Sequence, residues 1–262
     1  GTLFGRNTEG GAVNIVTKRP TGEFGLEAKA GVGNFNAYTG EFRLNLPAIA
    51  NVAFKLDGVV SSKDGWVDNP LITASDFAGY EKSGLNAQLL WTPTENFTAN
   101  YSFDTSRDET STLYQQLLAP GSLPIPAAAL QGGSRAENSV YGVPQQPSVG
   151  IARGHRLTLE WAALPNLTVK SISGFRDLKQ GQYDNGSAST AVGRNGSTFL
   201  NQDLARYSLA NFRQEQVSEE LQVIGEVPRL KYAFGGLYYR EVVQDNAVAV
   251  FTNTFTTADG SA

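Results

Sequence analysis

The sequence predicts an all-β chain that forms part of an antiparallel transmembrane β-barrel. Apolar and polar residues alternate with a period of two along about nine stretches of roughly 9–13 residues. These lengths match the roughly 9–11 residues that cross a bilayer obliquely, and they exceed the roughly 5–6 residues of ordinary strands. Short and long connections then alternate along the chain, which is typical of barrels in outer membranes.

Three strands are predicted first, at about residues 23–32, 38–46 and 52–61, each with one apolar and one polar face. Charged side chains are costly against lipid, so we expect the polar faces to line a wet lumen. The charged residues on the polar faces of these and later strands are Glu27, Lys29, Glu41, Arg43, Lys55, Asp57, Arg156, Glu160 and Lys170.

Six further strands follow the same alternation, at about residues 85–91, 97–104, 156–161, 167–176, 214–224 and 230–243. The stretch at 214–224 fits the pattern least well, because Glu219 falls on the face that otherwise carries aliphatic residues.

Four predicted connections are short and contain a proline, which stops strand pairing and fixes a turn. These prolines are Pro47, Pro93, Pro165 and Pro228. The connections between them are long, at about 62–82, 105–152, 177–212 and from Gln244 onward, except for the short Gly33–Ala37. Short turns at one rim and long loops at the other again predict an outer-membrane barrel.

Trp91 and Trp161 each lie at the end of a predicted strand, just before a short proline turn. An indole ring has an apolar body and a polar N–H, so it suits the boundary between lipid and water. We therefore expect these two tryptophans in an aromatic girdle on the periplasmic side, although tryptophans in the core of a β-sandwich would show the same spacing.

The composition excludes several kinds of site. The chain has no cysteine, which excludes disulfides, thiol catalysis and cysteine-ligated zinc. The formal charge of −4 argues against nucleic-acid binding. His155 is the only histidine, and we expect it at the rim, at the start of a strand. No serine-nucleophile or phosphate-loop motif occurs. We therefore expect no catalytic residue, no metal site, no cofactor and no enzyme activity.

The opening residues carry the most specific motif, GTLFGRNTEGGAVNIVTKRP at residues 1–20. This stretch resembles the end of the plug domain in TonB-dependent receptors of the Gram-negative outer membrane. The matching positions are Phe4, Gly5, Gly10, Gly11, Asn14, Ile15, Thr17 and Lys18, and Arg6 is expected to pair with the lumen wall.

The resemblance implies that residues 1–22 are the C-terminal end of a plug domain and 23–262 the N-terminal part of the barrel. Barrels of this type have 22 strands, so about nine strands indicate an internal fragment that would not insert alone as a stable barrel. The implied function is uptake of a scarce nutrient, most often a ferric siderophore or similar chelate. The implied partners are outer-membrane lipid, the extracellular ligand and the TonB energy-coupling protein.

Ligand recognition in such a receptor is expected in the long loops and upper lumen, where aromatic and arginine side chains suit bulky or anionic chelates. The candidates are Trp66, Tyr80, Tyr114, Arg135, Tyr141, Tyr183 and Arg194. Two other functions stay open, a passive porin-type channel and a soluble secreted carbohydrate-binding β-domain.

Overall fold

The computed structural model describes residues 17–72, 74–114, 116, 134–139, 145–185, 192–194, 197–199 and 207–250. None of these residues forms a helix long and apolar enough to cross a membrane. The strands are β1 (Gly25–Gly33), β2 (Ala37–Ile49), β3 (Val52–Lys63), β4 (Tyr80–Thr94), β5 (Phe97–Thr110), β6 (Ser148–Leu164), β7 (Leu167–Asn185), β8 (Val192–Arg194), β9 (Ser197–Phe199), β10 (Tyr207–Val227) and β11 (Leu230–Val250).

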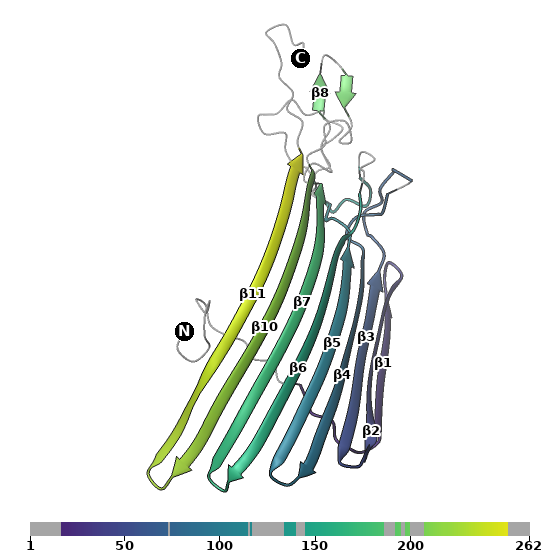
Figure 1. The fold of residues 1–262 in the computed structure, drawn as a ribbon. Helices are drawn as coiled ribbons and strands as arrows, with labels where there is room; N and C mark the ends of the chain where they lie inside the picture. Colours follow the sequence, from purple (N-terminus) through teal and green to yellow (C-terminus); the bar gives the residue numbers. More distant parts are fainter. Residues whose placement is uncertain are drawn as a thin grey trace.

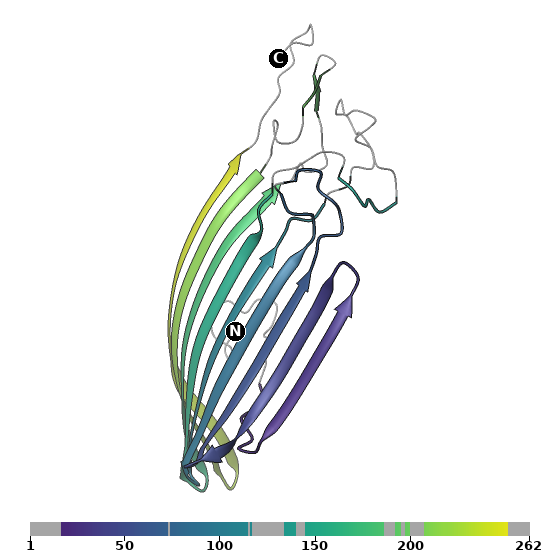
Figure 2. The same ribbon diagram turned by 90° about the vertical axis from the view of Figure 1, so that its right-hand side faces the viewer.

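Nine of the strands form one antiparallel sheet in the order β1-β2-β3-β4-β5-β6-β7-β10-β11, while β8 and β9 pair separately. Each strand of the large sheet therefore pairs with its neighbours in sequence, as the alternating pattern predicts. Figures 1 and 2 show a tall, curved sheet with most of its tight turns at the lower end, while the β1–β2 turn and the β3–β4 connection lie at upper ends of their strands. Among the described residues, β1 and β11 are the two edges of this open sheet.

The two faces of the sheet differ in what covers them. We call the inner face the one on which residues 17–21 lie, because Lys55 of β3 and Gln88 of β4 hydrogen-bond to Lys18 and Thr17. The opposite, outer face is covered by no described part of the chain. Only Ala53, Val67 and Phe77 are buried among the described hydrophobic residues, so the sheet has no protein core on its apolar side.

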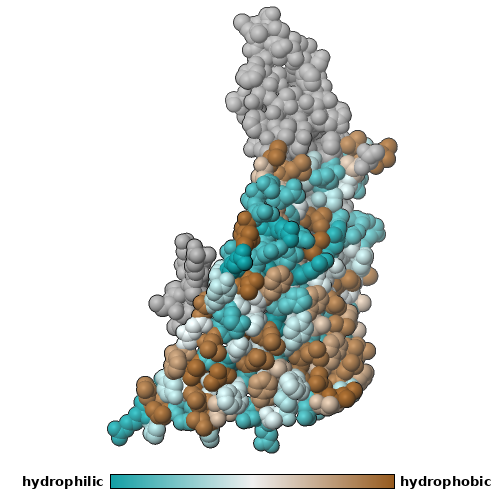
Figure 3. All heavy atoms as spheres, viewed as in Figure 1, coloured by the Kyte–Doolittle hydropathy of each residue, from teal (hydrophilic) through white to brown (hydrophobic). Residues whose placement is uncertain are grey.

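The outer face is hydrophobic over much of its area. Its exposed side chains include Phe42, Leu85, Leu89, Trp91, Tyr101, Trp161, Val217, Leu221 and Phe234. In Figure 3 hydrophobic side chains gather over the lower half of the sheet, and a hydrophilic area lies above them. An apolar surface this extensive marks a face that contacts lipid or another protein.

The predicted nine-stranded sheet is confirmed, but the strands reach further upward than the alternation indicates. β5 continues to Thr110, β6 already begins at Ser148, and β7 continues to Asn185. In these upper stretches both faces carry polar residues, so apolar and polar side chains no longer alternate clearly. The antiparallel pairing of the strands nevertheless continues. The predicted long connection at about 177–212 also contains the short paired strands β8 and β9.

Two of the four prolines lie within strands rather than in the turns. β2 extends past Pro47 to Ile49, and β4 extends past Pro93 to Thr94. Both strand ends have a shift of register, between Leu46 and Ile49 and between Trp91 and Thr94. Proline lacks an N–H and is tolerated in a strand at such irregular positions.

His155 lies in the interior of β6, not at a strand start, and it is on the outer face. Its Nδ1 is 2.7 Å from the Tyr101 hydroxyl oxygen, and its ring centroid is 4.9 Å from that of Phe103. Neither Tyr101 nor Phe103 is the carboxylate or the serine that a catalytic triad would place beside His155. The sequence misplaced the strand start because Arg153 and Gly154 interrupt the apolar pattern.

Candidate functional site

The inner face of β1 to β3 carries a chain of ion pairs. The Arg43 guanidinium donates to Asp57 Oδ1 at 3.0 Å and to Glu27 Oε2 at 3.0 Å. Lys55 Nζ donates to the other oxygen of Asp57 at 2.7 Å. The strands place these residues together, because Arg43 is the register partner of both Glu27 and Asp57. The alternation alone predicted that all four would face the same way.

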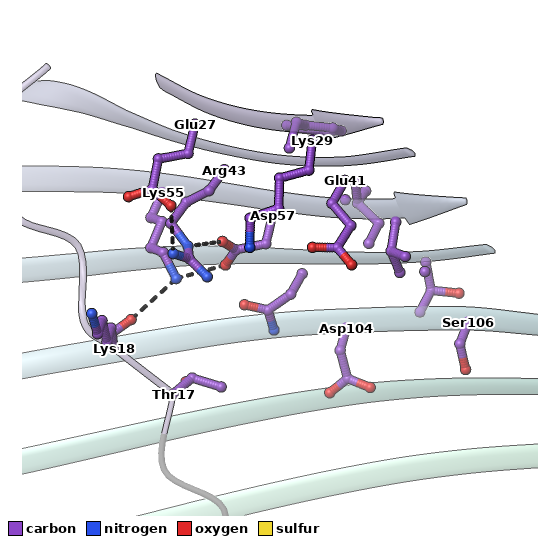
Figure 4. Close-up of a pocket in the computed structure, with 17 residues that line it drawn as sticks. Thr17, Lys18, Glu27, Lys29, Glu41, Arg43, Lys55, Asp57, Asp104 and Ser106 are labelled. Atoms are coloured by element: carbon purple, nitrogen blue, oxygen red, sulfur yellow. Dashed lines mark hydrogen bonds and ion pairs between the residues drawn. The ribbon is translucent and has the colours of Figure 1, made fainter. Parts of the chain in front are cut away.

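Lys55 is the deepest cation of this chain, with 4% of its side chain exposed. A buried ammonium is costly unless it is paired and hydrogen-bonded. Here Asp57 supplies the counter-charge, and the Lys18 carbonyl accepts a second hydrogen bond at 3.3 Å. Figure 4 shows both partners converging on the Lys55 nitrogen. Lys55 therefore joins β3 to the segment that precedes β1.

Three further contacts hold the 17–21 segment on the inner face. Gln88 is 1% exposed and donates to Thr17 Oγ1 at 3.3 Å. Asn45 Oδ1 accepts from the Thr21 backbone N–H at 3.2 Å. The Arg19 guanidinium lies 3.7 Å from Glu160 Oε2 on β6. The segment is thus attached to four different strands through polar groups.

A cavity of about 690 Å³ lies beside this network. Its charged lining is balanced, with four carboxylates and four cations: Glu27, Glu41, Asp57 and Asp104 against Lys18, Lys29, Arg43 and Lys55. Figure 4 shows these side chains projecting from several strands into one space. Because positive and negative side chains are equal in number, the cavity has no large net charge. Within the described residues no cluster of three or more acidic or histidine side chains could hold a metal ion.

Three of the predicted ligand-binding residues meet in one cluster at the upper end of the sheet. Arg135 Cζ lies 3.6 Å from the centre of the Trp66 ring, and the Tyr114 ring packs edge-on against Phe77 at 5.0 Å. Val67 and Phe77 are fully buried beneath them. Trp66, Arg135 and Tyr114 come from two connections, so the cluster fastens the β3–β4 connection to the β5–β6 connection.

The backbone reinforces this attachment. The Asp68 N–H donates to the Glu137 carbonyl at 2.9 Å, and the Ser139 N–H donates to the Asp68 carbonyl at 2.9 Å. The sequence could not have revealed the pairing of Trp66 with Arg135, because about 70 residues separate them and no repeat or motif connects them.

Of the other predicted ligand-binding residues, Tyr80 and Tyr183 lie apart from this cluster. Tyr80 begins β4 on the inner face, with Lys82 Nζ 5.4 Å from the centre of its ring. Tyr183 lies near the upper end of β7, where its N–H donates to Ser148 Oγ at 2.9 Å. Arg194 ends β8, for which only the backbone is described. Tyr141 lies outside the described residues, as do the plug-motif positions Phe4, Gly5, Arg6, Gly10, Gly11 and Asn14.

Trp91 and Trp161 both project from the outer face near the lower turns, with 46% and 49% of their surface exposed. Phe97 lies between them: it is the register partner of Trp161, and its ring centroid is 6.3 Å from that of Trp91. Three aromatic rings from three neighbouring strands therefore form a row at one level. That this row marks a membrane boundary stays a prediction.

No protein-family model matches the chain. Among solved structures it resembles the siderophore receptor PiuA from Acinetobacter baumannii, with a TM-score of 0.64 and 13% identity over 91% of this chain and 33% of that one. It also resembles the ferric-catecholate import receptor Fiu from E. coli K12 in its closed form, with a TM-score of 0.67 and 13% identity over 92% and 34%. This is the fold of a TonB-dependent receptor barrel.

A third similar structure is the ferric yersiniabactin uptake receptor FyuA from Yersinia pestis, with a TM-score of 0.64 and 14% identity over 94% of this chain and 34% of that one. The chain spans about a third of the length of each of these receptors. The resemblance to the TonB-dependent receptors is thus confirmed for the fold, and the nine strands correspond to part of the receptor barrel.

Proposed function

We propose that this chain is part of an outer-membrane receptor that takes up a scarce nutrient by active transport. One observation carries the proposal: the inner face holds a polar segment through buried Lys55 and Gln88, while the outer face of the same strands exposes hydrophobic side chains. A sheet with these two faces suits a wall between lipid and a polar interior. The receptor fold supports this assignment.

In this proposal the 17–21 segment is the last part of a plug that closes the lumen. Transport then requires a plug state that binds ligand and a second state that releases it, and the difference in affinity between them drives the gating. Energy relayed through TonB would shift the plug between these states. No covalent chemistry is needed.

The proposed ligand is a ferric siderophore or a similar metal chelate, as in the similar receptors named above. The ligand would contact the upper lumen and the connections, with Trp66, Tyr80, Tyr114, Arg135, Tyr141, Tyr183 and Arg194 as candidates. The cluster around Trp66 supports part of this set, because it offers an aromatic and cationic surface on a packed base.

The two alternative functions fit the structure less well. A passive porin-type channel needs no segment attached to four strands of its inner face. A soluble carbohydrate-binding domain would bury its apolar face against a second layer, which the described residues do not provide.

Uptake of ⁵⁵Fe-labelled chelates by the native bacterium tests the proposal. The protein is expressed from its complete open reading frame, and uptake is compared between wild type, a deletion of this gene and a deletion of tonB. We expect uptake of at least one ferric chelate to fall to background in both deletions. Uptake that survives loss of TonB but not of this gene would favour the passive channel instead.

Alanine substitutions at the seven candidate positions test where the ligand binds. We expect weaker binding of the transported chelate to whole cells, with Trp66→Ala and Arg135→Ala affected together because their side chains are in contact. Unchanged affinity across the entire set would remove these residues from the proposed site.

A further inference from the structure

A hollow of about 420 Å³ lies on the inner face, near the upper ends of β7, β10 and β11 (Figure 1). Its lower side is a row of three register partners, Gln180 of β7, Phe212 of β10 and Asp245 of β11. Phe212 is on the inner face because it lies an even number of residues from Ser218, whose register row includes the buried Gln88. None of the candidate ligand-binding residues named above lines this hollow.

Small side chains create the hollow. The next row up on the same face consists of Gln182, Ala210 and Ala247. Each alanine contributes only a methyl group, so space is left above the Phe212 ring and the Asp245 carboxylate. The hollow therefore combines an aromatic ring, two methyl groups, two amides and one carboxylate.

The hollow has one negative charge and, among the described residues that line it, no positive one. Asp245 supplies the negative charge. Arg176, four residues below Gln180 on β7, also faces inward, but Asp104 holds it at 3.1 Å. Within the described ranges no hydrogen bond or ion pair engages the side chains of Asp245, Gln180 and Gln182. These three acceptors are therefore available to a ligand.

Asp108 provides a contrast on the same register row and the same face. The row crosses the sheet from Asp108 on β5 to Asp245 on β11. Four strand spacings of about 4.8 Å separate the two carboxylates, or about 19 Å along the sheet. Lys82 Nζ lies 2.8 Å from the Asp108 carboxylate and balances its charge. Asp245 has no such counter-charge in the described chain, and it lies beside a hollow.

The register also fixes the height of the hollow. Trp161 pairs with Val169, which pairs with Val223 of β10, and Phe212 lies eleven residues above Val223. Eleven residues at about 3.3 Å each, on a strand tilted by about 35–45°, rise about 28 Å. The apolar band of an outer-membrane barrel is about 25 Å tall. In the proposed orientation the hollow therefore lies above this band, at the extracellular end of the lumen.

We propose that this hollow binds a cationic amino group of the transported chelate. The ammonium donates hydrogen bonds to the Asp245 carboxylate and to the side-chain oxygens of Gln180 and Gln182. It also lies against the face of the Phe212 ring, which attracts a cation. The methylene groups that carry the ammonium contact the two alanines. The site thus favours chelates with a free amine over neutral or acylated ones.

The inference rests on the proposed uptake function and adds to it one chemical group that the ligand must have. Binding of ferric chelates to the receptor, expressed from its complete open reading frame and purified in detergent, tests it by isothermal titration calorimetry. The first pair of probes is ferrioxamine B, which has a free amine, and its N-acetyl derivative. The second pair is a ferric tris-catecholate with one aminoalkyl arm and its N-acetyl derivative. The variants are Asp245→Asn and, as the matched control on the same row, Asp108→Asn.

We expect wild type to bind at least one amine-bearing chelate about tenfold more tightly than its acetylated partner, because only the amine forms charge-assisted hydrogen bonds. Asp245→Asn should lose this preference, and Asp108→Asn should keep it. Equal affinity within both pairs, including no binding of any member, would overturn the inference. A preference that persists in Asp245→Asn, or that Asp108→Asn loses equally, would also overturn it.

Failure of this inference is distinguishable from failure of the proposed function. Uptake that depends on this gene and on TonB, but only for amine-free chelates, would leave the transport function standing and remove the amine site alone.

Discussion

The inner and outer faces of the sheet are built from alternate residues of the same strands, yet they follow opposite rules. On β4, the inner residue Gln88 is almost fully buried and hydrogen-bonded, whereas the outer residues Leu85 and Leu89 are about 40% exposed. The difference comes from what covers each face: a polar segment of the chain on one side, and no described residue on the other. A hydrophobic face can stay uncovered only where its surroundings are themselves apolar.

A charge placed on the outer face gives the largest expected effect. Leu85 lies six residues above Trp91 on β4, near the middle of the proposed apolar band. We expect Leu85→Arg to destabilise the inserted barrel by about 2–4 kcal/mol. Urea unfolding of the full-length protein in vesicles measures this effect. Ser106→Arg is the matched control, because Ser106 lies on the same inner face as Asp104, two residues away on β5, and it should cost far less. Equal losses would mean that the two faces do not differ in surroundings.

A smaller effect is expected for the buried cation of the inner face. Lys55→Met leaves the Lys18 carbonyl without its donor and removes one partner of Asp57. Leaving a buried acceptor unsatisfied costs about 1–3 kcal/mol. We expect faster hydrogen exchange in residues 17–22, measured by mass spectrometry. Lys82→Met is the control: Lys82 pairs with Asp108 at 2.8 Å, but both side chains are about half exposed, and such pairs contribute about 0–1 kcal/mol. If both variants loosened the segment equally, Lys55 would have no special role.

The smallest effect is expected in the cluster that joins the two upper connections. Arg135→Ala removes the cation from the Trp66 ring, a contact of about 0.5–1 kcal/mol at an exposed site. The amides of Asp68 and Ser139, which bridge the connections, should then exchange about two- to fivefold faster. Arg107→Ala should leave them unchanged. Protection that persists in Arg135→Ala would show that the backbone bridge alone holds the connections together.

The alternation of residues predicted the lower half of the fold well, because the exposure of a side chain there depends on the face of the sheet that it lies on. It placed Arg43, Asp57 and Glu27 on one face, and the register of the strands then brings them together. The alternation gave no signal in the upper part of the sheet, where both faces are polar. It therefore did not predict the upper ends of β5, β6 and β7. Contacts between connections, such as Arg135 with Trp66, depend on three-dimensional proximity and left no pattern in the sequence.

Glu219 is an exception to the alternation of apolar and polar residues, and the fold accommodates it. It lies on the outer face as its position in the pattern required, and Ser171 on the neighbouring strand donates to its carboxylate at 2.8 Å. The partner comes from a strand about 50 residues away, so the sequence could flag the exception but could not explain it.

Spin labels on β5 test the central claim most directly, since the chain has no native cysteine to interfere. Single cysteines are placed at positions 99 to 104 of the full-length protein in membranes, and collision with oxygen is compared with collision with a water-soluble nickel chelate. The two faces predict strict alternation: odd positions, such as Tyr101 and Phe103, favour oxygen, and even positions, such as Ser102 and Asp104, do not. Equal access to both reagents along the strand would contradict the claim that β5 separates lipid from a polar interior.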